Sequence, residues 1–171
     1  MYNKNLKLIA AGISIAIAIY QFIEGFIGNG IMWILISGIF ILFYFKNEFI
    51  LLAFNRLRKE DFEGAEKWLD RIGSPEKMLV TKQQGYYWYL HGLILSQENL
   101  LRAEKFFKRA LRLGLSMKHD RAMANLNLAG IAMSKRRKRE AQRLLKEAQR
   151  LDKHNMMTEQ IRMMKQQMKR I

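Results

Sequence analysis

The chain of 171 residues has no cysteine and a single proline, Pro75. Without cysteine, a disulfide scaffold, a thiolate metal site and a thiol nucleophile are all excluded. One proline and eleven glycines are too few for a turn-rich all-β fold, because tight hairpin turns depend on such residues. The composition therefore favours helices, and the length fits about one domain of ordinary size.

Groups that could carry out catalysis are also scarce. The three histidines, His91, His119 and His154, are far apart and show no His/Asp/Glu spacing typical of a metal site. His91 is expected to pack on an apolar helix with one hydrogen-bond partner. His119 and Asp120 are expected to start a helix, with Asp120 as its N-cap. No nucleophile motif or phosphate-binding loop is present, so we expect no enzyme activity, no cofactor and no metal.

The apolar residues are concentrated near the N-terminus. Residues 8–23 and 25–45 contain no charged side chain, and Glu24 separates them. A bilayer core needs about 20 apolar residues of helix, which is close to the length of each run. Because glycines around positions 25–30 allow a tight reversal, we expect residues 1–46 to form a membrane-anchoring helical hairpin.

Basic residues flank this hairpin on one side. Lys4 and Lys7 precede the first run and Lys46 follows the second, while the turn between the runs carries only Glu24. The positive-inside rule then places both termini in the cytoplasm. We expect an integral protein of the cytoplasmic (inner) membrane. The alternative is a cleaved signal peptide, with the two N-terminal lysines as its charged region.

Small residues recur along the first apolar run. Ala10, Ser14 and Ala18 are spaced by four, and Gly12 with Ala16 forms a neighbouring pair. In lipid, small side chains allow two helices to approach closely. This face is expected to pack against the second apolar helix, or else to dock another membrane protein.

The remaining chain contains a threefold repeat with a period of 38 residues. Each copy has apolar residues at i, i+3, i+4 and i+7, the pattern of an amphipathic helix. The same shift relates leucines further upstream, so each copy is expected to be a pair of helices. The equivalent sets are Ala65, Trp68, Leu69 and Ile72; Ala103, Phe106, Phe107 and Ala110; and Ala141, Leu144, Leu145 and Ala148.

These pairs resemble the tetratricopeptide repeat (TPR) family, with WYLHGLIL (88–95) and RAEKFFKRAL (102–111) as the nearest match. The resemblance covers residues 47–155, although the period exceeds the usual 34 and the terminal proline is absent. It implies an α-solenoid of three stacked pairs, with a peptide groove lined by the first helix of each pair. The groove candidates are Tyr86, Tyr89, Leu93, Met123, Leu126 and Asn127.

That groove is predicted to be apolar and aromatic, since Asn127 alone keeps the polar character of repeats that clamp acidic tails. Its ligand is therefore expected to be a helix or an extended apolar peptide. Residues 156–171 carry apolar residues spaced by three or four and are expected to cap the last pair, or to form an adaptable methionine-rich surface. These residues are Met157, Ile161, Met164, Met168 and Ile171.

The junction between the hairpin and the repeats has two possible forms. No glycine or proline occurs between Ile39 and Leu57, which predicts that the second apolar helix runs without a break into the first repeat. A hinge at residues 46–48 is the alternative.

Charge is distributed unevenly, with 30 Lys+Arg against 15 Asp+Glu. The net charge is +1 over residues 1–45, zero over 46–99 and +14 over 100–171. A basic half predicts an acidic partner: ribosomal or other RNA, or anionic lipid. A simple solvated turn is the alternative for its densest run, 135–139. The candidate contacts are Lys135, Arg136, Arg137, Lys138, Arg139, Arg143 and Arg150.

The expected fold is all-α: an N-terminal transmembrane helical hairpin, a three-repeat TPR-like α-solenoid and a C-terminal capping helix. The expected function is a membrane-anchored cytoplasmic adaptor or scaffold that binds other proteins, including a role as an accessory subunit of a membrane complex. The alternative is a factor that docks ribosomes or other nucleic acid at the membrane through the basic C-terminal half.

Overall fold

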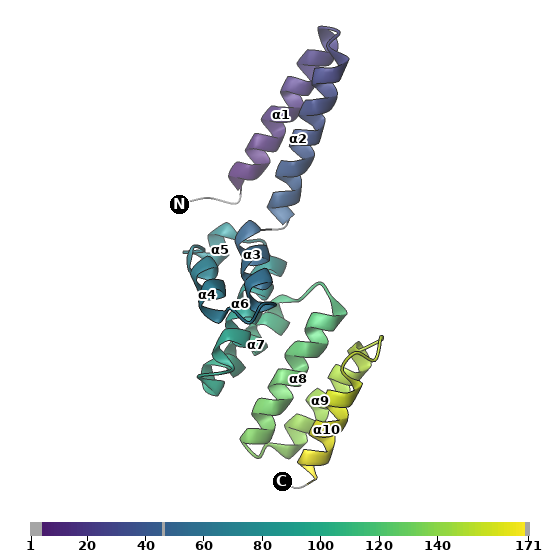
Figure 1. Cartoon of the computed structure of the whole chain (residues 1–171). Helices are drawn as coiled ribbons and strands as arrows, with labels where there is room; N and C mark the ends of the chain where they lie inside the picture. The colour runs from purple at the N-terminus through teal and green to yellow at the C-terminus, as the bar shows by residue number, and fades with distance from the viewer. Residues whose placement is uncertain (1–4, 46, 170–171) are drawn as a thin grey trace. The chain divides into compact units, whose positions relative to one another are not determined.

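A computed structural model describes residues 5–45 and 47–169, and every regular element in these ranges is a helix (Figure 1). The predicted all-helical class is confirmed. The chain divides into two compact units, Met1–Gln83 and Gln84–Ile171. The helices are α1 (Asn5–Ile23), α2 (Ile27–Phe45), α3 (Glu48–Leu57), α4 (Phe62–Asp70), α5 (Pro75–Met78), α6 (Thr81–Leu95), α7 (Leu100–Leu113), α8 (Lys118–Ser134), α9 (Lys138–Leu151) and α10 (Thr158–Met168).

In the first unit, α1 and α2 lie side by side and run in opposite directions (Figure 1). Gly25 adopts a φ of +81° in the turn between them, a conformation that glycine tolerates without strain. The Ser37 hydroxyl of α2 donates a hydrogen bond to the Ala11 carbonyl of α1 at 3.2 Å. Most large aliphatic side chains of both helices point outward, and each helix is long and apolar enough to cross a membrane.

The helix is interrupted at Asn47, between α2 and α3, so the prediction of an unbroken helix is wrong, and the break falls within residues 46–48, where the alternative placed it. Asn47 is extended, with φ −68° and ψ 129°, and its side chain accepts a hydrogen bond from the Phe49 amide at 3.0 Å. Asparagine competes with helix continuation by capping the next helix, which explains a break without glycine or proline. Lys46 lies outside the described residues. At the same end, the Lys7 ammonium pairs with the Glu48 carboxylate at 2.6 Å.

The first helix pair, α3 and α4, turns at Glu60, whose φ is 60°. Asp61 then caps α4 by accepting a hydrogen bond from the Gly64 amide at 2.8 Å. This bond is the main cause of the lowered pKa of Asp61. Phe49 of α3 stacks on Trp68 of α4 with ring centroids 6.1 Å apart.

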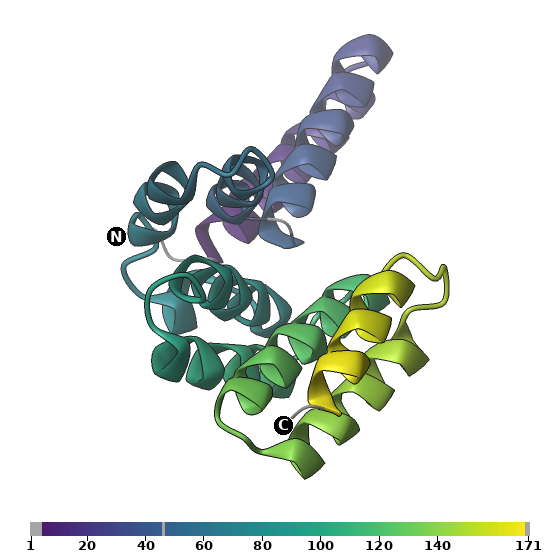
Figure 2. The same cartoon turned by 60° about the horizontal axis from the view of Figure 1, so that its bottom comes forward.

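The second unit contains α6 from Gln84 onward, its pair partner α7, the pair α8 and α9, and then α10, while Thr81–Gln83 at the start of α6 belong to the first unit. Gly92 of α6 lets the Phe107 ring of α7 approach so closely that an added Cβ would lie 2.9 Å from it. α10 lies against α8 and α9 (Figure 2). It buries Ile161 and Met168, while Ile171 lies outside the described residues.

The 38-residue period of the sequence corresponds to a repeated packing position. Ala65, Ala103 and Ala141 are each 0% exposed in the second helices of the three pairs. Four residues further along, Leu69, Phe107 and Leu145 are also fully buried. A small residue therefore admits the neighbouring helix, and a large one fills the space beside it, in every pair.

Candidate interaction surfaces

A groove of about 460 Å³ lies in the second unit among α8, α10 and the turn that joins α6 to α7. Met123, Leu126 and Asn127 of α8 line one side, and Met163 and Met164 of α10 line the other. Serine, glutamine, glycine, leucine and isoleucine complete the lining, and none of its side chains carries a charge. The groove is thus methionine-rich with amide groups along it.

The six predicted groove residues separate into two sets. Met123, Leu126 and Asn127 line the groove described above, whereas Tyr86, Tyr89 and Leu93 of α6 do not. The Asn127 side chain donates to the Met123 carbonyl at 2.9 Å, which fixes its orientation on α8.

Tyr86 and Tyr89 instead join helices inside the second unit. The Tyr86 hydroxyl donates to the Asp120 carboxylate at 2.8 Å and accepts from the Met117 amide at 3.2 Å. Burial, and then the hydrogen bond to Asp120, raises the pKa of Tyr86 to about 12. Tyr89 is 3% exposed and lies edge-on to Phe107, and burial raises its pKa as well.

Asp120 is not the N-cap that its sequence context predicts. α8 begins at Lys118, so Asp120 lies in the first turn and is 4% exposed. Its carboxylate is buried because it accepts the Tyr86 hydroxyl from a helix 34 residues away. No local sequence pattern predicts the pairing of Tyr86 with Asp120.

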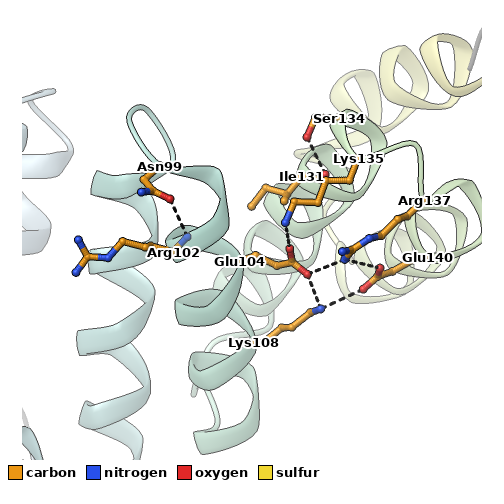
Figure 3. Close-up of polar contacts among 9 residues, drawn as sticks. All are labelled: Asn99, Arg102, Glu104, Lys108, Ile131, Ser134, Lys135, Arg137 and Glu140. Atoms are coloured by element: carbon orange, nitrogen blue, oxygen red, sulfur yellow. Dashed lines mark hydrogen bonds and ion pairs between the residues drawn. The ribbon is translucent and has the colours of Figure 1, made fainter.

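One acidic residue of α7, Glu104, organises the charges around the turn between α8 and α9 (Figure 3). Its carboxylate pairs with Lys108 at 2.6 Å, with Arg137 at 3.1 Å and with Lys135. Glu140 pairs with Lys108 at 3.3 Å and with Arg137 at 3.5 Å. Hydrogen bonds from Lys108 and Lys135 lower the pKa of Glu104 to about 2, and the pKa of Lys108 is raised in turn.

This network divides the predicted basic run. Lys135 and Arg137 face Glu104, so their charges are compensated within the unit. Arg136, Lys138 and Arg139 are exposed, and Arg136 occupies the turn with a φ of 55°. The sequence shows the five cations together, but the structure pairs two of them with an acid 31 and 33 residues away.

The other two predicted contacts, Arg143 and Arg150, lie on the exposed side of α9. Both line a groove of about 580 Å³ among α7, α8 and α9. Arg150 pairs with Glu147 on its own helix at 2.7 Å, which lowers the pKa of Glu147 and raises that of Arg150.

The small residues of α1 also separate into two faces. Ser14 and Ala18 are buried, and Ala10 is half-buried on the same side. Gly12 and Ala16 are exposed, and an added Cβ at Gly12 would have no other atom within 4 Å.

Within residues 5–45 and 47–169, no three His, Cys, Asp or Glu side chains gather as they would around a metal ion. The His91 ring lies 4.5 Å from Tyr87 and 6.0 Å from Phe106, centroid to centroid. In comparisons with known proteins, no family model, curated protein or solved structure matches this chain.

Proposed function

We propose that this protein is a membrane-anchored adaptor of TPR-like architecture, without enzymatic activity, that binds an apolar segment of another protein in its methionine-rich groove. The uncharged groove among α8, α10 and the α6–α7 turn is the observation that carries the proposal. The buried alanines that recur every 38 residues support stacked helix pairs as its scaffold.

Anchoring is supported by the surface of α1 and α2. Ile9, Ile27 and Leu35 are 58%, 63% and 65% exposed, and each helix shows such side chains along its length. In water this surface would be costly, since roughly 25 cal/mol is lost per Å² of apolar area left exposed. In lipid the same side chains are solvated. Lys7 lies at the end of the α1–α2 hairpin from which α3 continues, and it pairs there with Glu48. By the positive-inside rule, a basic residue at this end supports a cytoplasmic position for α3 and the helices after it.

Because the chain lacks cysteine, its orientation can be tested with single-cysteine variants in a native background. Glu24→Cys, in the turn between α1 and α2, should react with a membrane-impermeant thiol reagent added outside intact cells. Met156→Cys, in the second unit, should react only after permeabilisation. Labelling of Met156→Cys in intact cells, or recovery of the protein in the soluble fraction, would overturn the anchoring part of the proposal.

The chemistry of the groove defines its ligand. Methionine side chains adapt their shape to different apolar partners, and the amides of Asn127 and neighbouring glutamines can hydrogen-bond to a peptide backbone. An uncharged lining offers no counterion for a carboxylate tail. The ligand class is therefore an amphipathic helix or an extended apolar peptide.

A pair of methionines provides a matched test of the groove. Met163 lines it and is 53% exposed, whereas Met156 is 70% exposed and does not line it. A photo-crosslinking residue at position 163 should capture a discrete protein that position 156 does not. Met163→Lys should abolish co-purification of that protein in high salt, and Met156→Lys should leave it unchanged. Identical capture at both positions would contradict groove binding.

A second candidate function, as an accessory subunit of a membrane complex, is favoured by the exposed Gly12 and Ala16 of α1. Small residues on a lipid-facing side permit close approach of another helix. Gly12→Leu should then release a membrane partner in mild detergent while α1 stays paired with α2. If no partner is lost, this role is excluded for that face.

A further inference from the structure

The exposed face of α9 carries a row of cations along the helix. Arg139, Arg143, Lys146 and Arg150 follow one another at spacings of four, three and four residues, so they lie on one side of α9. At 1.5 Å rise per residue the row is about 17 Å long. All four residues are exposed, while the leucines and alanines of the opposite side are buried against the unit.

The acids beside this row are already engaged. Glu140 pairs with Lys108 and Arg137, and Glu147 pairs with Arg150. Within the part of the chain that the structure describes, Arg139, Arg143 and Lys146 make no ion pair. These three cations therefore remain available to an external anion.

A groove of about 580 Å³ lies beside the row, among α7, α8 and α9. Lys108 borders it on the α7 side, and Arg143, Lys146 and Arg150 border it on the α9 side. Leu111 and Leu144 contribute apolar surface to its lining. Glu140 and Glu147 also line the groove, where they pair with Lys108 and Arg150. The cations of the lining that a ligand meets without an ion pair are Arg143 and Lys146.

We propose that the cationic row of α9 binds the phosphate backbone of double-stranded nucleic acid, for which an RNA duplex is the probe. Arginine forms two parallel hydrogen bonds to a phosphate, and cations spaced evenly along a helix suit a polymer with phosphates at short, regular intervals. Residues 138–151 contain no aromatic side chain that could stack on the bases of a single strand. Binding is therefore through the backbone and independent of base sequence.

A membrane surface fits the same row less well. Helices that lie in a lipid interface bury an apolar face among the acyl chains, whereas the apolar face of α9 is buried within its own unit. The inference goes beyond the adaptor function and does not depend on the methionine-rich groove, because the two surfaces share no lining residue.

The test measures binding of the full-length chain, in neutral detergent, to a fluorescent RNA duplex as salt is varied. The Arg150–Glu147 pair is exposed and weak, so a phosphate can replace the carboxylate and Arg150 adds a fourth contact. Four phosphate contacts predict a slope of log affinity against log salt of about −3.6, or roughly a 100-fold loss between about 50 and 200 mM salt. The variant R139Q/R143Q/K146Q should bind about 100-fold or more weakly near 0.1 M salt, with a slope near −1.

A matched control removes the same charge elsewhere. Arg58, Lys59 and Lys82 are exposed cations of the first unit, and R58Q/K59Q/K82Q should bind RNA like the parent chain. Met163→Lys should also retain RNA binding, which separates this inference from the adaptor function. Equal weakening in the control would show an effect of net charge only and overturn the proposal. So would binding to phosphatidylserine vesicles without binding to the duplex, or a salt slope that the α9 variant leaves unchanged.

Discussion

Replacing Glu104 with glutamine should destabilise the second unit more than any other neutralisation of a single acid on its surface. Its side chain is 13% exposed and pairs with cations from α7, from the end of α8 and from the turn before α9. A carboxyl whose pKa falls from 4.5 to about 2 on folding contributes about 3 kcal/mol near neutral pH. Since Lys108 and Arg137 are half-exposed and screened by solvent, we expect a measured loss of about 2 kcal/mol.

Glu147→Gln is the matched control, because Glu147 also pairs with an arginine but only within α9. An exposed pair three residues apart on one helix is worth a few tenths of a kcal/mol, roughly 0.3 to 0.5. Hydrogen exchange followed by mass spectrometry on the full-length chain resolves the loss by segment. Glu104→Gln should accelerate exchange in α8 and α9, and Glu147→Gln should change it little.

The difference in stability between the parent chain and Glu104→Gln depends on pH in a defined direction. Folding depresses the pKa of Glu104, so its contribution is fully present above the unfolded value near 4.5 and is lost as pH falls through the folded value near 2. The gap in stability between the parent chain and Glu104→Gln should therefore be constant from neutral pH to about 5 and shrink below it. A gap that persists unchanged at pH 2, or a loss no larger than that of Glu147→Gln, would refute the reasoning.

Three further substitutions test the packing. Ala18→Leu should separate α1 from α2 in a crosslinking assay, at a cost of about 1 to 3 kcal/mol from overpacking, whereas Gly12→Leu should leave the pair intact. Gly92→Ala should lower the melting temperature of the second unit, because its methyl group would lie 2.9 Å from a fully buried phenyl ring. Tyr86→Phe should lower the free energy of unfolding by about 1 to 3 kcal/mol in a denaturant titration, since the buried Asp120 carboxylate loses its hydroxyl donor. Unchanged stability in any of the three variants would contradict the packing described for that site.

The spacing of apolar residues along the chain is enough to predict most of the helices. The apolar periods place α4, α7 and α9 with their buried faces, and the alanines at positions 65, 103 and 141 are fully buried as the period requires. The junction between α2 and α3 is the exception. Asn47 is a strong N-cap, and it ends the continuity that the absence of glycine and proline predicted between α2 and α3.

The candidate sites were predictable only in part. Met123, Leu126 and Asn127 line a groove, but Tyr89 is buried and Tyr86 is committed to Asp120. The spacing of residues along a helix shows which of them share a face. It does not show which other part of the chain covers that face, so buried tyrosines and groove-lining tyrosines look alike in the sequence. The methionine-rich wall contributed by α10 could not be assigned to that groove for the same reason.

The sequence by itself determined that this chain is helical, where its apolar surface is concentrated, and that its C-terminal half is strongly basic, because propensity, hydrophobic period and charge are local properties of the residues. Only the tertiary structure decided which of those charges remain available. Glu104 compensates Lys135 and Arg137 across more than 30 residues, while Arg139, Arg143 and Lys146 stay exposed along α9. Pairing depends on distance in space, and the packing of α7 against α8 establishes that distance.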